Sequence, residues 1–210
     1  MSNPWIDVTR PITIGMQVWP GDPAPEIVQT RFMDKGDSYN LSKVALSVHT
    51  GTHMDAPRHF VRDGVPMDDL PLDAVIGEVR VIQINDPVAV RPAEPPADIA
   101  AGERILFRTR NSTELWAKPG FQEDFVYISN EAAKVLASRG VKTVGIDYLS
   151  IGGFHDDLVE THETILGAGI WVIEGLDLSQ IEPGSYEMVC LPLKLAAVEG
   201  SPARVVLRRL

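Results

Sequence analysis

The chain has 210 residues and no long polar or Ser/Gly-rich stretch, which predicts a single domain over residues 1–210. Hydrophobic residues make up 44% and charged residues 23%, so the composition excludes a disordered chain. The formal net charge of -10 argues against binding to nucleic acid or to an acidic membrane surface, because both attract basic proteins.

Short apolar or β-branched runs bounded by Gly, Pro or Asp predict strands over residues 26–32, 41–48, 78–84, 104–109, 142–147, 169–174, 186–193 and 203–207. A first helix is predicted over residues 131–139, with Ser129 or Asn130 as N-cap and Gly140 as its end. A second is predicted over residues 158–166, between Asp156 or Asp157 and Gly167 or Gly169. Many strands and few helices predict an α+β fold.

Two further features concern organisation and compartment. Residues 86–97 carry four prolines and are expected to form an extended surface loop, a weak candidate for a domain boundary. The single cysteine, Cys190, cannot form an internal disulfide and is expected to be a buried apolar side chain. No signal peptide or membrane helix is visible in the sequence, so we expect a cytoplasmic protein.

Three of the five histidines fall within eleven residues, in His49-Thr-Gly-Thr-His53-Met-Asp55-Ala-Pro-Arg-His59. Imidazoles mixed with a carboxylate suit a divalent metal such as Zn²⁺ or Mn²⁺, and the absence of cysteine argues against a purely structural zinc site. Thr50, Gly51, Thr52 and Pro57 disfavour a helix here.

We expect instead a strand that ends near Val48 and a tight turn at Gly51 that folds His53 and Asp55 back towards His49. In that strand Ser47 and His49 would lie on the face opposite Val44, Leu46 and Val48. A polar loop with surface histidines is the alternative.

A second cluster joins His162 to Glu174. The helix would carry the chain ~9 Å beyond His162, and the following strand would return it by ~13 Å, which brings Glu174 close to His162. Glu174 ends an apolar run, where a carboxylate is costly to bury unless it is paired or binds a metal. The alternatives are a solvated strand end for Glu174 and an exposed helix face for His162.

Three other residues carry weaker signals. His155 lies in a glycine-rich loop and is expected to be incidental. Asp147, at a strand end, could orient a ligand histidine or simply serve a turn. Trp19, in a turn-rich segment, is expected either to pack or to line a pocket.

The segment from His49 to His59 resembles the signature of the cyclase family of metal-dependent hydrolases. Val18-Trp-Pro-Gly-Asp-Pro23 is similar to the family's N-terminal substrate loop. The C-terminal third of the family is resembled by three further segments of this chain: Gly175-Leu-Asp-Leu, Leu191-Pro-Leu-Lys-Leu and Gly200-Ser-Pro-Ala-Arg204. The resemblance implies a swivelling β/β/α domain with a central barrel-like mixed sheet and few helices, assembled as a homodimer or homotetramer.

The resemblance also implies a ligand set for two divalent metal ions, with Zn²⁺ as the first choice and Mn²⁺ as the alternative. His49, His53 and Asp55 would bind one ion, and His162 the other. Asp55 would bridge the two ions and Glu174 would be shared with the second.

Two roles outside the ligand set are implied as well. His59 would be a catalytic proton shuttle, and Trp19 would flank the aromatic ring of a small-molecule substrate.

The implied activity is hydrolysis of an amide, with N-formyl-L-kynurenine as the first candidate substrate. Asp147-Tyr-Leu-Ser150, Thr161-His162 and the loop over residues 151–155 depart from the formamidases of the family. This departure favours, as an alternative, the opening of a cyclic amide, imide or lactone in the manner of an isatin hydrolase. A non-catalytic, metal-stabilised binding protein is the alternative from another class, and the presence of His59 argues against it.

Overall fold

A closed barrel of seven strands forms the centre of the molecule, in a computed structural model that describes residues 3–210. The strands are β4 (His53–Asp55), β5 (Ile76–Gln83), β7 (Arg104–Arg108), β9 (Thr143–Ile146), β10 (Trp171–Glu174), β11 (Gly184–Pro192) and β12 (Gly200–Arg209). Their order around the barrel is β12-β11-β5-β7-β9-β10-β4, and β4 pairs back to β12. The sheet is mixed, because β5, β7, β9 and β10 run parallel and the remaining pairings are antiparallel. The expected barrel-like mixed sheet with few helices is confirmed.

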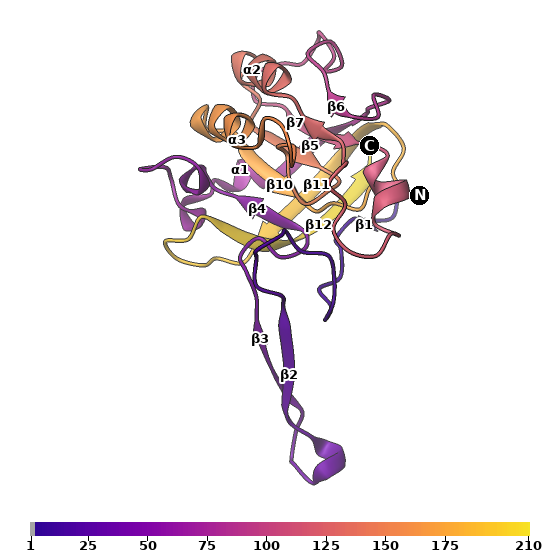
Figure 1. Cartoon of the computed structure of the whole chain (residues 1–210), viewed down its shortest axis with the longest axis vertical. Coiled ribbons are helices and arrows are strands. Elements are labelled where there is room, and N and C mark those ends of the chain that lie inside the picture. Colours follow the sequence, from indigo (N-terminus) through magenta and orange to yellow (C-terminus); the bar gives the residue numbers. More distant parts are fainter. Residues whose placement is uncertain (1–2) are drawn as a thin grey trace.

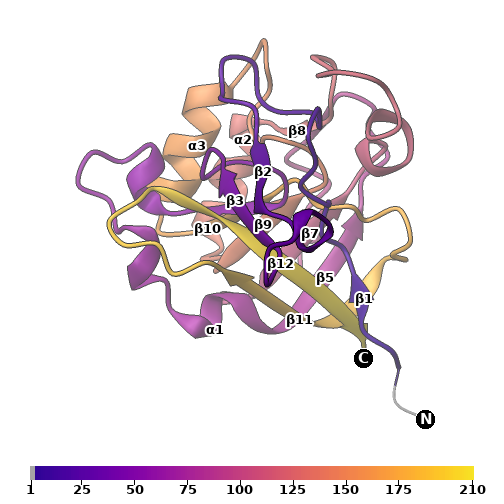
Figure 2. The ribbon, with the colours of Figure 1, turned by 90° about the horizontal axis from the view of Figure 1, so that it is seen from below.

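Both faces of the barrel wall are apolar. Leu106 faces the interior core with Val79, Val81 and Met188, whereas its neighbours Ile105 and Phe107 face an outer core beneath the helices. This alternation follows from the two-residue period of a strand. β1 (Ile6–Asp7) pairs with the distal half of β12, so the two end segments of the chain lie side by side (Figure 2).

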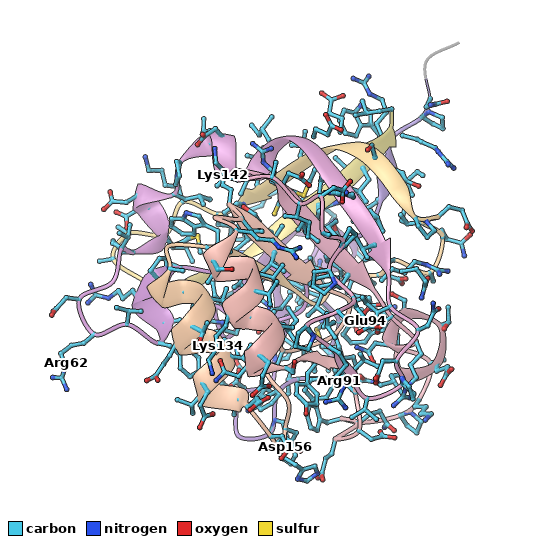
Figure 3. The ribbon with its side chains drawn as sticks, turned by 90° about the horizontal axis from the view of Figure 1, so that it is seen from above. Arg62, Arg91, Glu94, Lys134, Lys142 and Asp156 are labelled. Carbon is cyan, nitrogen blue, oxygen red and sulfur yellow. The ribbon has the colours of Figure 1, made fainter. Side chains whose placement is uncertain are left out.

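Two helices cover the outer core. α2 (Asn130–Ser138) and α3 (Leu158–Gly167) lie beside each other, with Lys134 on the outer face of α2 (Figure 3). Ser129 caps α2 by accepting a hydrogen bond from the Ala132 N–H. Asp157 precedes α3 but accepts instead from the Asn130 N–H (2.9 Å), which ties the two helices together. Both predicted helices are confirmed.

The smaller elements connect the barrel strands. They include α1 (Leu72–Val75), a π-helical turn over Asn111–Leu115, and the parallel pair β6 (Ala89–Val90) and β8 (Tyr127–Ile128). The expectation that residues 86–97 form an extended surface loop is confirmed except at Ala89 and Val90, which are buried in the β6–β8 pairing. Within residues 3–210, no helix is both long enough and apolar enough to cross a membrane.

An antiparallel hairpin of β2 (Glu26–Arg31) and β3 (Leu41–Ala45) projects away from the barrel (Figure 1). Every residue of both strands is exposed. The prediction of a strand over residues 41–48 is wrong at its end: β3 stops at Ala45, since Ala45 pairs with the first residue of β2 and residues 46–48 have no partner strand. Val44 is 53% exposed and marks no buried face.

Candidate metal centre

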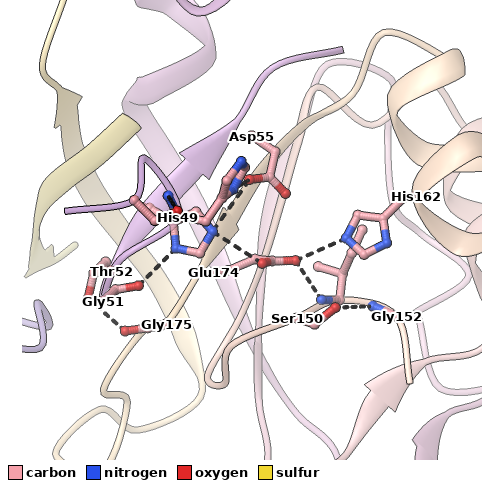
Figure 4. Close-up of polar contacts among 12 residues, drawn as sticks. His49, Gly51, Thr52, Asp55, Ser150, Gly152, His162, Glu174 and Gly175 are labelled. Atoms are coloured by element: carbon pink, nitrogen blue, oxygen red, sulfur yellow. Dashed lines mark hydrogen bonds and ion pairs between the residues drawn. The ribbon is translucent and has the colours of Figure 1, made fainter. Parts of the chain in front are cut away.

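The predicted turn between His49 and His53 is present. Gly51 has a φ of 69°, a left-handed conformation that glycine adopts without strain, and β4 begins two residues later. His49 Nδ1 lies 2.9 Å from Asp55 Oδ1, and the His49 and His53 rings meet edge to face at 5.0 Å. The hypothesis that the turn folds His53 and Asp55 back towards His49 is therefore confirmed; Figure 4 shows His49 and Asp55 side by side.

β4 brings a third ligand candidate to His53 and Asp55. It pairs antiparallel with β10 in a register that places His53 opposite Glu174. His53 Nε2 lies 3.3 Å from Glu174 Oε2 and 3.4 Å from Asp55 Oδ1. The other ring nitrogen, Nδ1, donates to the Gly51 carbonyl oxygen (2.8 Å), which points Nε2 at the two carboxylates.

His162 and Glu174 meet as the helix and strand lengths predicted. His162 Nε2 is 3.3 Å from Glu174 Oε1, and the Nδ1–H of the ring donates to the Leu158 carbonyl oxygen (2.6 Å). Glu174 Oε1 also accepts from the Ile151 N–H (2.6 Å), which fixes the carboxylate between the two histidines (Figure 4). Both side chains are buried, so the solvent-exposed alternatives for them are excluded.

His59 completes the cluster from a different direction. A single 3₁₀ turn over Pro57–His59 places its ring in a stack on His49, with the ring centres 4.1 Å apart, and 6.0 Å from His162. Burial lowers the pKa of His59, and the neighbouring His49 and His162 lower it further against the opposing field of Asp55.

Buried charge dominates the electrostatics of this site. Burial opposes ionisation of Asp55, but His49 and His53 outweigh it and hold the pKa of that carboxyl well below its usual range. Burial likewise disfavours protonation of His53, yet Asp55 and Glu174 raise its pKa to about 10. In the absence of a metal ion, the carboxylates therefore favour protonation of His53 and His162, as expected of a site that attracts cations.

The donor set fits divalent metal ions. His49 Nε2, His53 Nε2 and Asp55 Oδ2 are buried without a hydrogen-bond partner, although buried polar atoms are almost always paired. Atoms that could bind a metal ion gather in two groups, His49–Asp55–His59 and His53–Asp55–Glu174, each within 4.8 Å. Asp55 belongs to both groups.

A cavity of about 170 Å³ opens beside this cluster. His49, His59, His162 and Glu174 form one wall, and Phe60, Leu149 and Trp19 form apolar walls. Trp19 packs edge-on against Phe121, Phe125 and Phe154, with ring centres 5.2–6.3 Å apart. Trp19 therefore both packs and lines the pocket.

The remaining candidates lie outside the cluster. Asp147 accepts hydrogen bonds from Thr109 and Ser112 and, among residues 3–210, from no histidine, so it stabilises the turn that follows β7. His155 is exposed and pairs with Glu123 at 3.1 Å. The Tyr148 side chain is buried, with its hydroxyl donating to Gln17 and accepting from the Gln122 N–H. Of the departing pair Tyr148-Leu149, only Leu149 lines the cavity.

Two glycines that shape the site were not identified from the sequence as functional. A Cβ at Gly200 would lie 2.7 Å from His49 Cε1, and one at Gly175 would lie 2.2 Å from the Gly51 carbonyl oxygen. Both glycines lie in segments that resemble the cyclase family, and this resemblance could have indicated that they matter to the site. Thr52 holds the two segments together, because its hydroxyl donates to the Gly175 carbonyl oxygen (2.6 Å; Figure 4).

Comparison with known proteins agrees with this geometry. Residues 6–152 match the model of a family described as "Putative cyclase". The chain is 38% identical over 206 residues to a kynurenine formamidase from Salinibacter ruber, covering 97% of this chain and 96% of that protein. The structure of a protein described as a "predicted metal-dependent hydrolase", from Bacillus stearothermophilus, is 33% identical, covers 100% of both chains and gives a TM-score of 0.85. Isatin hydrolase A from Labrenzia aggregata also gives a TM-score of 0.85, but at 22% identity over 98% of this chain and 93% of that chain it shares the fold alone.

Proposed function

Because the chain belongs to the cyclase family, we propose that it is a metal-dependent hydrolase of non-peptide carbon–nitrogen bonds, an arylformamidase that converts N-formyl-L-kynurenine to L-kynurenine and formate. The observation that carries the proposal is the set of unpaired ligand atoms of His49, His53 and Asp55 beside an aromatic-lined cavity. The identity of 38% to a kynurenine formamidase over nearly its whole length supports the substrate.

In this proposal five side chains hold two divalent cations, Zn²⁺ or Mn²⁺: His49, His53, Asp55, His162 and Glu174. Such cations polarise a carbonyl and lower the pKa of water from 15.7 to about 7. The protein contributes fixed orientation, because backbone carbonyl groups of Gly51 and Leu158 hold the Nδ1–H groups of His53 and His162.

His59 acts as the proton shuttle. Its pKa is lowered mainly by burial, so the ring is neutral and can accept a proton near neutral pH. It takes the proton of the attacking water on an imidazole nitrogen as the new carbon–oxygen bond forms. It then returns the proton to the amine nitrogen as the carbon–nitrogen bond breaks, which releases formate and the free aryl amine.

Trp19 and Leu149 bind the aryl part of the substrate. Trp19 presents a rigid apolar wall, because three aromatic neighbours hold its ring in place. The formyl group is small, so a cavity of about 170 Å³ accommodates it next to the ligand cluster.

Opening of a cyclic amide, imide or lactone is the second candidate. Leu149 favours it, because this residue lines the cavity at a position that departs from the formamidases. A binding protein without turnover is the least supported reading, since His59 lines the cavity at the ligand cluster.

Hydrolysis of N-formyl-L-kynurenine by the purified protein tests the proposal. The metal-free protein, prepared with a chelator, is compared with protein reloaded with Zn²⁺ or Mn²⁺. Turnover that is lost on chelation and restored by metal is the expected result. Metal-loaded protein that leaves this substrate intact but opens isatin or a lactone would replace the first candidate by the second.

We also propose that the protein works in the cytoplasm. Cys190, the single cysteine, is a buried free thiol whose pKa is raised by burial, so the fold uses it as an apolar side chain. A reducing compartment is compatible with that use.

A further inference from the structure

Asp22 is a charged side chain of the cavity to which the proposed function gives no role. It lines the same cavity as Trp19 and is half-buried, whereas His162 and Glu174 at the ligand cluster are buried. Asp22 therefore lies nearer to solvent than the cluster does, at the mouth of the cavity. A charged group placed on an otherwise apolar cavity wall fixes the orientation of a ligand and provides specificity.

The Asp22 carboxylate has capacity left for a ligand. Within residues 3–210 it forms no ion pair, and its side chain accepts one hydrogen bond, from the Ser47 hydroxyl to Oδ2 (3.3 Å). No lysine or arginine of this described part of the chain lines the cavity. Oδ1 is thus free to accept from a cationic group of a ligand, and charge-assisted hydrogen bonds of this kind are stronger than neutral ones.

A tight turn holds Asp22 in a fixed position relative to Trp19. The Asp22 N–H donates to the Trp19 carbonyl oxygen (3.0 Å), and between the two residues stand Pro20 and Gly21, whose φ is 98°. Proline followed by a glycine of positive φ is typical of a type II turn, in which the first and fourth Cα atoms lie within about 7 Å of each other. The aromatic wall and the carboxylate therefore suit a ligand that carries a cation on a short chain attached to an aryl ring.

We propose that Asp22 binds the ammonium group of an aryl formamide that carries an amino-acid side chain, and so determines which aryl amides the protein prefers. This inference rests on the proposed function, because N-formyl-L-kynurenine carries its α-ammonium group on a short chain next to the formamide. With the aryl ring against Trp19 and the ammonium group at Asp22, the formamide reaches the more deeply buried ligand cluster. The α-carboxylate stays towards solvent, since no basic side chain within residues 3–210 lines the cavity to pair with it.

The hydrogen bond from Ser47 gives Asp22 a second, structural role. Ser47 Oγ also accepts from the His49 N–H (3.2 Å), so Asp22 supports the segment that carries a candidate metal ligand. Loss of this support alone would slow every substrate alike. Ser47→Ala removes the hydrogen bond but keeps the carboxylate, and it therefore separates support of the segment from recognition of an ammonium group.

The test uses metal-loaded protein and the ratio of kcat/KM for N-formyl-L-kynurenine to kcat/KM for its analogue with hydrogen in place of the α-amino group. The wild type should prefer the amino substrate, and so should Asp63→Asn, which removes an exposed carboxylate outside the cavity. Asp22→Asn should lower the ratio by about 10–100-fold, as expected for loss of a hydrogen bond between charged groups. Ser47→Ala should keep the wild-type ratio, even where it slows both substrates.

Binding of the product separates this test from that of the proposed function. L-kynurenine, titrated into metal-loaded protein in a calorimeter, should bind about 10–100-fold more weakly to Asp22→Asn than to Asp63→Asn. A protein that cleaved no aryl formamide but bound L-kynurenine with this dependence would lose the proposed function and keep recognition by Asp22.

Two results would overturn recognition by Asp22 while the proposed function stands. One is cleavage of both formamides with the same ratio in Asp22→Asn as in the wild type. The other is a wild type that shows no preference for the amino substrate, a result that does not depend on the folding of any variant.

Discussion

Replacement of Gly200 by alanine should displace His49 and weaken metal binding. The added Cβ would lie 2.7 Å from His49 Cε1, 3.1 Å from His49 Nε2 and 3.0 Å from the Met54 carbonyl oxygen. Carbon atoms pack at about 3.5–4.0 Å, so the ring would have to retreat by about 1 Å. The backbone cannot yield instead, because Gly200 pairs with Asp55 where β12 meets β4.

The crowding around the added Cβ sets the expected loss of stability and of metal affinity. Overpacking of this kind costs about 1–3 kcal/mol of stability. A ligand that loses its supporting contacts weakens a metal site by about 10–100-fold. The Zn²⁺ dissociation constant, measured by competition with a chromogenic chelator, should rise by that factor in Gly200→Ala.

Gly167→Ala is the matched control, because Gly167 ends α3 with nothing within 4 Å of an added Cβ. This variant should keep the wild-type affinity and gain about 0.4–1 kcal/mol from the reduced freedom of its unfolded chain. If Gly200→Ala bound Zn²⁺ as tightly as Gly167→Ala, the reasoning about His49 would be refuted.

Three further outcomes are expected. His59→Ala should retain its metal content but lose about 10²–10⁴-fold in turnover; full activity would remove His59 from the mechanism. In the metal-free protein burial lowers the pKa of His53, but Asp55 and Glu174 raise it to about 10. The stabilisation from His53 is thus complete below about pH 6.5 and is lost as the pH rises through about 10, which urea unfolding across this range would detect. Tyr148→Phe should lose about 1–3 kcal/mol of stability without loss of turnover, because the hydroxyl serves Gln17 and Gln122 rather than the cavity; an inactive, stable variant would contradict this.

The local part of the candidate site could be predicted from the sequence. The return of Glu174 to His162 depends only on the rise per residue of one helix and one strand. The turn at Gly51 depends on neighbouring residues that disfavour a helix. The contact between His49 and Asp55 could therefore also be predicted from a short stretch of sequence.

The non-local part could not be predicted in this way. β4 has only three residues, two of them polar candidate ligands, and it forms a strand because it pairs with β10 on one side and β12 on the other. The prediction that the last strand begins at Ala203 missed Gly200 to Pro202, because a proline argues against a strand interior although it is tolerated opposite His53. Alternation over residues 41–48 predicted a strand. The period of a strand does not reveal its pairing partner, and here β3 pairs with β2 in a hairpin outside the barrel.

The position of β4 determines when the site can form during synthesis and folding of the chain. This short strand closes the ring between β10 and β12, so the candidate ligands His53, Asp55 and Glu174 come together only when a segment from the first third meets segments from the last fifth. A chain still emerging from the ribosome, without residues 200–209, has no closed seam on which to assemble a centre. The candidate ligands can therefore come together only after nearly the whole chain has been synthesised.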